Sequence, residues 1–308
     1  MKIISFSEEP PSASSLALKR GALRRHERLG AMPLSGQREE LQRLHKAALL
    51  PPGTNAGSVL ARGVPCEWLQ KDGASYKKAV LYIHGGGWVL GDLSVARHAG
   101  SLLAASFGRR VLTVGYRLAP EHPFPAGLND CRDAYLWLLE NGYSPRDIAL
   151  AGDSAGGNLA LCLLALLLET QTPLPSAAVL FSPVTDLGEG SELRKNPIPL
   201  CHTIYKGERR SVFELYTDLD PQNPLISPVA GNLSEYPPIL IHVGSDEPLA
   251  ADCAAFAEKS FLLGGRARCK IWNDMFHDFS IFGPALKESR ESLAEAAEFL
   301  RAVQAETP

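Results

Sequence analysis

Short apolar runs, each bounded by glycine, proline or charged residues, recur along the chain from about residue 64 onwards. Runs of this length without polar alternation are typical of strands that are buried on both faces of a sheet. The predicted strands are residues 79–83, 111–114, 148–151, 178–181, 239–243 and 269–272.

Longer segments with the spacing of helices separate most of these predicted strands. They cover residues 95–107, 129–139, 155–169 and 251–263, and Gly264 follows the last of them as a typical helix stop. Strands that alternate with helices form a mostly parallel sheet, with right-handed connections that cover both of its faces. The pattern therefore predicts an α/β fold.

Two parts of the chain do not follow this alternation. Within residues 1–55, apolar side chains recur at helical spacing over residues 41–49 before Pro51 interrupts the pattern, which predicts one or two amphipathic helices. Residues 187–236 are rich in proline, glycine and charge, and the segment is too long for a plain connection between two elements. We expect this segment to be an insertion above the functional site of a domain that spans residues 56–308.

Composition excludes several classes of partner. The 308 residues include 31 Lys and Arg against 34 Asp and Glu, a formal charge of -3. This balance gives no electrostatic reason to expect a nucleic acid or an anionic membrane surface as a partner. The six cysteines stand singly, without a C-x-x-C pair, so we expect buried reduced thiols and neither a metal site nor a redox site. A small neutral substrate fits this composition better.

The N-terminal residues lack the unbroken apolar core of a signal peptide. The longest apolar run, residues 159–168, has about half the length that spans a bilayer, so it is interpreted as a core helix. We expect a cytoplasmic protein without a membrane span.

One candidate nucleophile lies between a predicted strand and a predicted helix. The sequence Gly152-Asp153-Ser154-Ala155-Gly156 joins residues 148–151 to the helical segment that follows. A turn this sharp strains its central residue and tolerates only small neighbours, so it presents Ser154 at the start of a helix, where free N–H groups favour developing negative charge. The setting favours a nucleophile over a chance match to G-x-S-x-G.

A glycine-rich loop follows the first predicted strand of the alternating pattern. In His84-Gly85-Gly86-Gly87-Trp88, three glycines allow backbone N–H groups to approach a bound oxygen closely, which suits an oxyanion hole. A phosphate-binding loop is the alternative, but neither G-x-x-x-x-G-K-[ST] nor G-x-G-x-x-G is completed here. We expect His84 to hold the loop and Trp88 to form a wall of the pocket.

Two further strand ends carry ionisable residues. Asp246 and Glu247 follow residues 239–243, and His277 follows the last predicted strand. Nucleophile, acid and histidine in this order are typical of α/β hydrolases. The histidine would accept the proton of Ser154, and the acid would fix its tautomer.

With these motifs the chain resembles the hormone-sensitive lipase family of α/β-hydrolase carboxylesterases. The resemblance rests on the segments His84–Trp88, Tyr116–Ala126, Gly152–Asn158 and His277–Phe279. It implies Ser154 as nucleophile, His277 as general base and acid, and the amides of Gly86, Gly87 and Ala155 as the oxyanion hole.

The resemblance also implies a short- to medium-chain carboxylesterase that forms an acyl-enzyme and needs no cofactor or metal, in a family whose members often assemble as homodimers. Residues 1–55 and part of residues 187–236 would form a cap over the pocket, which Trp88 and Asp153 are expected to line. Around Tyr116–Ala126, we expect a charge network of Arg117, Glu121 and Asp130 to brace the loops.

Two residues depart from the family's pattern. Glu247 stands where the family has Asp before Pro-Leu, and Asp278 follows His277 where Gly is common. The register, 30 positions from Glu247 to His277, favours Glu247 as the triad acid, and Asp246 stays the alternative.

Two other functions are compatible with these residues. An amidase or an acyltransferase would use the same triad. The family also resembles hormone receptors that keep the fold but lose the triad histidine, and the presence of His277 argues against this alternative.

Overall fold

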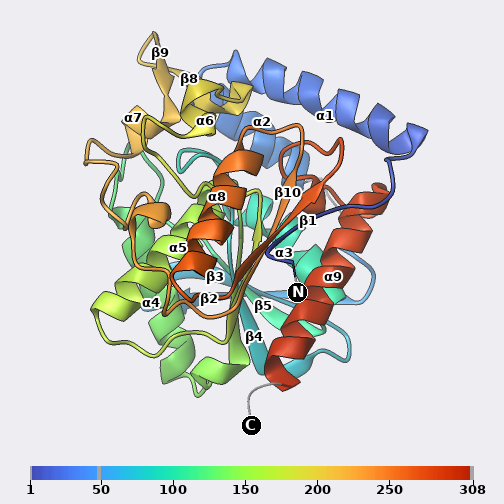
Figure 1. Ribbon diagram of the computed structural model, residues 1–308, viewed down its shortest axis with the longest axis vertical. Coiled ribbons are helices and arrows are strands. Elements are labelled where there is room, and N and C mark those ends of the chain that lie inside the picture. The colour runs from blue at the N-terminus through green and yellow to red at the C-terminus, as the bar shows by residue number, and fades with distance from the viewer. Residues whose placement is uncertain (1, 47–49, 306–308) are drawn as a thin grey trace.

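The computed structural model describes residues 2–46 and 50–305. One large twisted sheet lies at its centre (Figure 1). Within these residues the sheet has nine strands, in the order β1-β11-β10-β7-β6-β4-β5-β3-β2. Their bounds are β1 (Ile4–Phe6), β2 (Thr54–Ala61), β3 (Val64–Lys71), β4 (Ser75–Ile83), β5 (Arg109–Val114), β6 (Ile148–Asp153), β7 (Ala177–Phe181), β10 (Ile239–Gly244) and β11 (Ala267–Trp272).

The six strands predicted from apolar runs form the parallel centre of this sheet. The expected α/β-hydrolase architecture is confirmed. Three strands that the pattern does not predict lie at the edges: β1 pairs in parallel with β11, and the β2–β3 ribbon joins β5 in antiparallel orientation. Most side chains of β2 are exposed or half-buried, as expected for an edge strand, so it carries no continuous apolar run.

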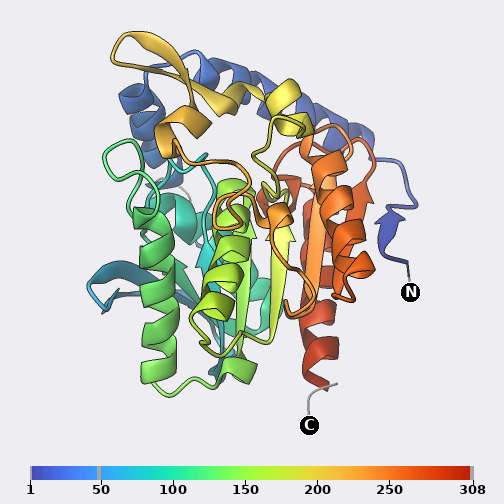
Figure 2. The same ribbon diagram turned by 60° about the vertical axis from the view of Figure 1, so that its left-hand side comes forward.

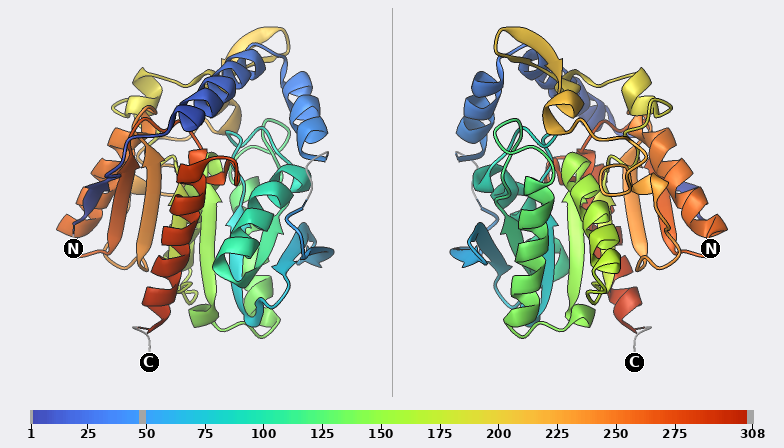
Figure 3. Two further views of the ribbon diagram at one scale, coloured as in Figure 1. Left: turned by 90° about the vertical axis from the view of Figure 1, so that its right-hand side faces the viewer. Right: turned by 90° about the vertical axis from the view of Figure 1, so that its left-hand side faces the viewer.

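Helices cover both faces of the sheet (Figure 3). Successive side chains of a strand point to opposite faces, so a continuous apolar run gives both faces apolar side chains that need to be covered. Val80 and Tyr82 of β4 pack on the face that is covered by α3 (Leu93–Phe107) and α9 (Lys287–Ala305). Leu81 and Ile83 pack on the opposite face. The helices on that face are α4 (Ala126–Glu140), α5 (Ser154–Glu169) and α8 (Leu249–Leu262).

The apolar run that follows Ser154 is a core helix, as expected. The side chains from Leu159 to Ala165 are all buried, because α5 lies between the sheet and neighbouring segments. In residues 2–46 and 50–305, no helix combines the length and the apolar character that crossing a membrane requires.

The N-terminal helices α1 (Ala13–Gly30) and α2 (Leu34–Lys46) extend across the carboxyl-terminal ends of the strands (Figure 2). The predicted helical pattern over residues 41–49 lies in α2 as far as Lys46, and residues 47–49 lie outside the described residues. Residues 187–236 lie on the same side of the sheet. This segment contains α6 (Glu192–Lys195), η2 (Pro199–Cys201), β8 (His202–Tyr205), β9 (Glu208–Ser211), α7 (Val212–Tyr216) and η3 (Pro228–Ala230).

These two segments pack against each other above the sheet. The end of α1 lies so close to η2 that a side chain at Gly30 would have its Cβ only 2.4 Å from the carbonyl oxygen of Pro199. A β-bridge between Pro33 and Ile204 continues the contact. The segments therefore form one layer over the strand ends, whereas β1 belongs to the sheet itself.

The expected charge network at the loops is only partly present. Arg117 binds Asp130 at 2.7 Å, as expected, but the partner of Glu121 is Arg38 of α2, at 2.8 Å. Arg38 also donates to the carbonyl oxygen of Val89 at 2.8 Å. The expectation for Glu121 was wrong because a basic side chain from the N-terminal helices, far away in sequence, reaches this carboxylate.

All six cysteines are buried and free.

Candidate active site

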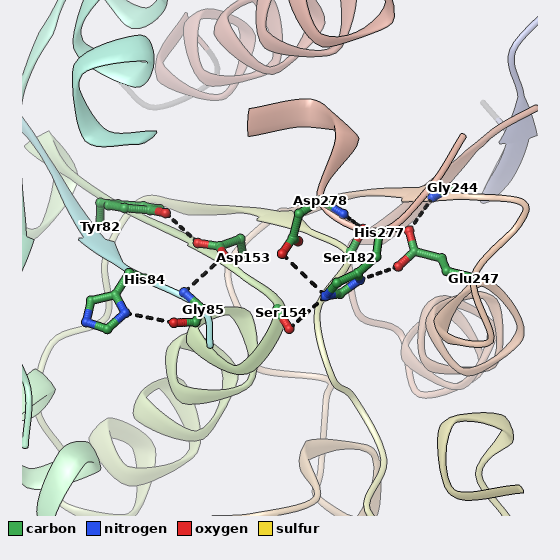
Figure 4. Close-up of polar contacts among 10 residues, drawn as sticks. All are labelled: Tyr82, His84, Gly85, Asp153, Ser154, Ser182, Gly244, Glu247, His277 and Asp278. Carbon is green, nitrogen blue, oxygen red and sulfur yellow. Dashed lines mark hydrogen bonds and ion pairs between the residues drawn. The ribbon is translucent and has the colours of Figure 1, made fainter. Parts of the chain in front are cut away.

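Ser154 occupies the sharp turn between β6 and α5, with a backbone φ of 50° in the left-handed region (Figure 4). Two glycines permit this turn. A Cβ at Gly152 would lie 2.6 Å from the carbonyl oxygen of Gly156, and a Cβ at Gly156 would lie 2.1 Å from that of Ile83. Because backbone atoms cannot yield at such distances, the G-x-S-x-G sequence is a steric requirement of this turn.

Three side chains from separate strand ends form a continuous line of hydrogen bonds (Figure 4). Ser154 Oγ lies 3.0 Å from Nε2 of His277, and Nδ1 of His277 lies 2.6 Å from Oε2 of Glu247. Ser154 follows β6, Glu247 follows β10 and His277 follows β11. All three residues are buried. The structure thus brings together the serine, the histidine and one of the two candidate acids.

Glu247 is the acid that contacts His277, and its carboxylate is fully engaged. Oε1 of Glu247 accepts hydrogen bonds from the hydroxyl of Ser182 and from the N–H of Gly244, both at 2.6 Å. Three donors converge on this carboxylate, and the Nδ1 of His277 is the one that donates to Oε2. Asp246 instead pairs with Lys19 of α1, away from the histidine.

A second carboxylate contacts the other side of the histidine ring. Oδ2 of Asp278 lies 3.3 Å from Nε2 of His277. Burial lowers the pKa of His277, but the negative charges of Asp278, Glu247 and Asp153 outweigh it and raise this pKa to about 9. Burial raises the pKa of the Asp278 carboxyl well above its ordinary value. The negative charge of Asp278 therefore favours the protonated form of His277 in the free protein.

The glycine-rich loop after β4 is held from beneath by Asp153. One carboxylate oxygen of Asp153 accepts from the N–H of Gly85 at 3.0 Å, and the other accepts from the hydroxyl of Tyr82. The Nδ1 of His84 donates to the carbonyl oxygen of Gly85 at 2.8 Å, and this ring stacks on Tyr116. Burial lowers the pKa of His84 to about 4, so its ring is neutral. His84 and Asp153 together fix the loop.

Two consecutive glycines of this loop have a backbone that other residues rarely adopt. Gly86 has a φ of 116° and Gly87 a φ of 59°. Within the described chain, the N–H groups of these two residues donate to no protein acceptor. Both residues line the cavity that contains Ser154, and Ala155 lies in the first turn of α5 beside it.

A cavity of about 480 Å³ opens at Ser154. Its walls come from the strand ends, from α1 and α2, and from the segment 187–236, and they are mainly apolar. The residues from the two covering segments are Ala22, Arg25, His26, Leu29, Leu41, Leu44, His45, Leu193, Ile198, Leu200, Cys201, Val212 and Phe213. In the described chain, no group of His, Cys, Asp or Glu side chains is arranged to hold a metal ion.

The two expected pocket residues both line this cavity, in different ways. Trp88 is only 2% exposed and stacks on Tyr216 with ring centroids 4.4 Å apart, so it belongs to the core as much as to the wall. Asp153 lines the cavity, but both of its carboxylate oxygens accept hydrogen bonds from protein groups. Burial raises the pKa of Asp153 to about 6.

Two contributors to the site were missed by sequence reasoning. Ser182, which supports Glu247, directly follows β7, so an inspection of every strand end would have found it. Tyr82 lies inside β4 on the α3 face, and only its position across from Asp153 shows its part in holding the glycine-rich loop. Nothing in the local sequence signals that position.

Comparison with known proteins agrees with this geometry. A family profile of the alpha/beta hydrolase fold matches residues 80–281, from the strand before the glycine-rich loop to just beyond His277. The chain belongs to the α/β-hydrolase family. An esterase of the bacterial hormone-sensitive lipase family superimposes on this α/β hydrolase with a TM-score of 0.85 and 34% identity, covering 96% of this chain and all (100%) of the other.

Named relatives of this α/β hydrolase are also esterases. An acetyl-hydrolase of Streptomyces hygroscopicus is 38% identical over 262 residues, which are 82% of this chain and 85% of the relative. An esterase of Acinetobacter venetianus is 36% identical over 228 residues, which are 73% of this chain and 75% of the relative. The resemblance to hormone-sensitive lipases is confirmed, and this α/β hydrolase is a carboxylic ester hydrolase.

Proposed function

We propose that this enzyme hydrolyses short- to medium-chain carboxylic esters through an acyl-enzyme on Ser154. The observation that carries the proposal is the line of hydrogen bonds from Ser154 through His277 to Glu247, with lengths of 3.0 and 2.6 Å. Nucleophile, base and orienting acid within hydrogen-bond reach of one another are what acyl transfer requires.

In the first half-reaction, Nε2 of His277 accepts the hydroxyl proton of Ser154 while Oγ forms a bond to the ester carbonyl carbon. The carbonyl oxygen becomes negative, and the amides of Gly86, Gly87 and Ala155 would donate to it. The bond to the alkoxy oxygen then breaks, and Nε2 returns the proton to the departing alcohol. Ser154 is left as an ester of the acyl group.

In the second half-reaction, a water molecule gives a proton to Nε2 of His277 and attacks the acyl carbon. Collapse of this intermediate breaks the bond to Ser154 Oγ, which takes the proton back, and the carboxylic acid leaves. Glu247 holds the ring in one tautomer and stabilises the imidazolium throughout. Each proton has a donor and an acceptor among these side chains, the substrate and water, so the scheme needs no cofactor.

Unused amides support the assignment of the oxyanion hole. The N–H groups of Gly86 and Gly87 have no acceptor in the described chain, and those in the first turn of a helix such as α5 have no intrahelical partner. Donors that are fixed before the reaction stabilise the developing charge without reorganisation. Asp153 contributes indirectly, because it anchors Gly85.

The covering layer would act as a cap that sets substrate size. Side chains of α1, α2 and residues 187–236 line the cavity, and its volume of about 480 Å³ suits a small ester. The relative from Streptomyces hygroscopicus is named an acetyl-hydrolase, which agrees with a short acyl group. We therefore propose a cap, formed by these two segments, over a catalytic α/β domain.

A series of 4-nitrophenyl esters from acetate to palmitate tests this proposal on the purified full-length protein. We expect the highest kcat/KM between acetate and octanoate and a steep fall towards palmitate, with all hydrolysis lost in Ser154→Ala. Absence of hydrolysis across the series would favour a ligand-binding role and contradict the proposal. Equal rates on palmitate would contradict the size limit alone.

A further inference from the structure

The carboxylate of Asp278 lies on the cavity wall, beside the atom of His277 that moves the proton (Figure 4). Its two oxygens differ. Oδ2 is 3.3 Å from Nε2 of His277, whereas Oδ1 is buried and has no hydrogen-bond partner among the described residues. One acceptor of this side chain is therefore left unsatisfied by the protein.

Asp278 does not serve as a brace in the way that Asp153 does. Both oxygens of Asp153 accept hydrogen bonds from protein groups, and they hold the glycine-rich loop. The only ion pair that the described residues give Asp278 is the one with His277. Because a buried acceptor without a donor costs free energy, a carboxylate in this position calls for a partner from outside the protein.

The need for a donor is greatest when the enzyme is ready to react. Nε2 of His277 must then be unprotonated and accepts from the hydroxyl of Ser154, so the ring gives no proton to Oδ2 of Asp278, an acceptor 3.3 Å away. Two acceptors at this distance repel each other unless a hydrogen-bond donor relieves them. Other charged groups that face the histidine are Glu247 and Asp153, and His26 of α1 lies close enough to interact with it electrostatically.

The position of Asp278 defines which part of the substrate could supply that donor. In the proposed mechanism Nε2 returns its proton to the leaving oxygen, so this oxygen must lie within hydrogen-bond distance of Nε2. A donor on a carbon close to the leaving oxygen would then reach the carboxylate of Asp278. An acyl chain, on the other side of the scissile bond, is further from it.

We infer that Asp278 forms a binding site for a hydrogen-bond donor on the alcohol part of the ester. The preferred substrates are esters of an alcohol that carries a second hydroxyl or an ammonium group near the ester oxygen, such as monoesters of polyols or of amino alcohols. The inference rests on the proposed esterase mechanism. A plain alkyl ester would leave the carboxylate unpaired, and sites built to bind a donor discriminate strongly against substrates that lack it.

Three acetates test the inference: ethyl acetate, 2-hydroxyethyl acetate and 2-(dimethylamino)ethyl acetate, whose amine is protonated near neutral pH. Each kcat/KM is measured for the wild-type protein, Asp278→Gly and Asp278→Asn. Asp278 has a φ of 60°, a conformation that Gly and Asn both adopt readily. Asp274→Asn is the matched control, because Asp274 lies on the same loop with a φ of 56° but is exposed.

We expect the ratio of kcat/KM for 2-hydroxyethyl acetate to that for ethyl acetate to fall about 10- to 100-fold in Asp278→Gly, the range for a lost hydrogen bond to a charged group. Comparing ratios between variants cancels the intrinsic reactivity of each ester. Asp278→Asn retains a carbonyl acceptor, so it should keep part of the hydroxyl preference and lose the ammonium preference. The results with 2-hydroxyethyl acetate and with 2-(dimethylamino)ethyl acetate therefore distinguish a preference for polyol esters from a preference for amino-alcohol esters.

Ethyl glycolate, with its hydroxyl on the acyl side, should respond to Asp278→Gly no more than ethyl acetate does. An unchanged ratio for both donor-bearing acetates would overturn the inference. Equal losses on all substrates would also overturn it, because they are expected of a residue that acts only through His277. A different result would show that the proposed esterase function itself is wrong. In that case the wild-type protein would not hydrolyse ethyl acetate, or Ser154→Ala would hydrolyse it equally well.

Discussion

Oε2 of Glu247 lies 2.6 Å from Nδ1 of His277, whereas the carboxylate of the adjacent Asp246 pairs with Lys19. This arrangement predicts that Glu247→Gln and Asp246→Asn have very different effects. We expect Glu247→Gln to lower kcat by about 10⁴-fold, as loss of the orienting charge does in serine proteases. Steady-state kinetics with a 4-nitrophenyl ester measure both variants.

Asp246→Asn is the control for this pair, since it removes a charge one residue away without touching the histidine. It should change kcat less than about tenfold, in keeping with the small worth of exposed ion pairs. A nearly inactive Asp246→Asn together with an active Glu247→Gln would show that the acid was assigned wrongly.

The pKa of His277 predicts an alkaline activity profile. The reactive ring has an unprotonated Nε2, and burial together with the opposing charges of Asp278, Glu247 and Asp153 places its pKa at about 9. The imidazolium therefore predominates at neutral pH. We expect kcat/KM to rise with pH through a midpoint well above 6.5, the ordinary value of a histidine.

Removal of one of these charges should move the midpoint in a defined direction. Asp278→Asn takes away a carboxylate that stabilises the imidazolium, so the midpoint of kcat/KM against pH should fall towards 6.5. The control Asp274→Asn should keep the wild-type midpoint. A wild-type midpoint at or below 6.5, or no shift in Asp278→Asn, would contradict the role of this charge.

Ser182 is predicted to support both the stability and the activity of the enzyme. Its hydroxyl donates to Glu247 at 2.6 Å, so Ser182→Ala leaves a buried carboxylate one donor short. We expect the free energy of unfolding to fall by about 1–3 kcal/mol and kcat to fall with it. Urea unfolding and steady-state kinetics measure the two effects.

Ser176→Ala is the matched control for this change. Its hydroxyl donates to the carbonyl oxygen of Ile148 at 2.8 Å, at the start of the strands and far from the catalytic side chains. We expect a small loss of stability and an unchanged kcat. Equal effects of the two variants on kcat would argue against support of Glu247 by Ser182.

The proposed cap predicts that chain-length preference can be changed from η2. Leu200 lines the cavity from the segment 187–236, so Leu200→Trp should shorten the space for the acyl chain. We expect the ratio of kcat/KM for octanoate to that for acetate to fall at least tenfold, on the scale of methylene discrimination in apolar pockets. Leu262→Trp, at an exposed position, should leave the ratio unchanged. An unchanged profile in Leu200→Trp would mean that η2 does not limit the acyl chain.

The central sheet and the nucleophile were predictable because local sequence determines them. Buried parallel strands need continuous apolar runs, as in residues 148–151, and the turn at Ser154 needs Gly152 and Gly156 for steric reasons. The edge strands gave no such signal. β1 has three residues, and most side chains of β2 are not buried, so neither needs an apolar pattern.

The remaining features depend on contacts between distant parts of the chain. Spacing favoured Glu247 over Asp246 as the triad acid. The contact that engages the carboxylate of Asp246 away from His277 comes from Lys19, more than 200 positions earlier in the chain. The pairing of Glu121 with Arg38 has the same origin. Asp278 stood out only as a departure from a family pattern, and its contact with Nε2 becomes visible only when the loop after β11 is folded.

Covalent labelling tests the central claim, that Ser154 is the nucleophile, most directly. Diethyl 4-nitrophenyl phosphate transfers its phosphoryl group to an activated serine and releases nitrophenolate in equal amount. We predict one equivalent of nitrophenolate for each chain, a single diethylphosphoryl group located by peptide mass spectrometry on Ser154, and no label on folded Ser154→Ala. A label on another residue that accompanies loss of activity, or full esterase activity in Ser154→Ala, would contradict the account.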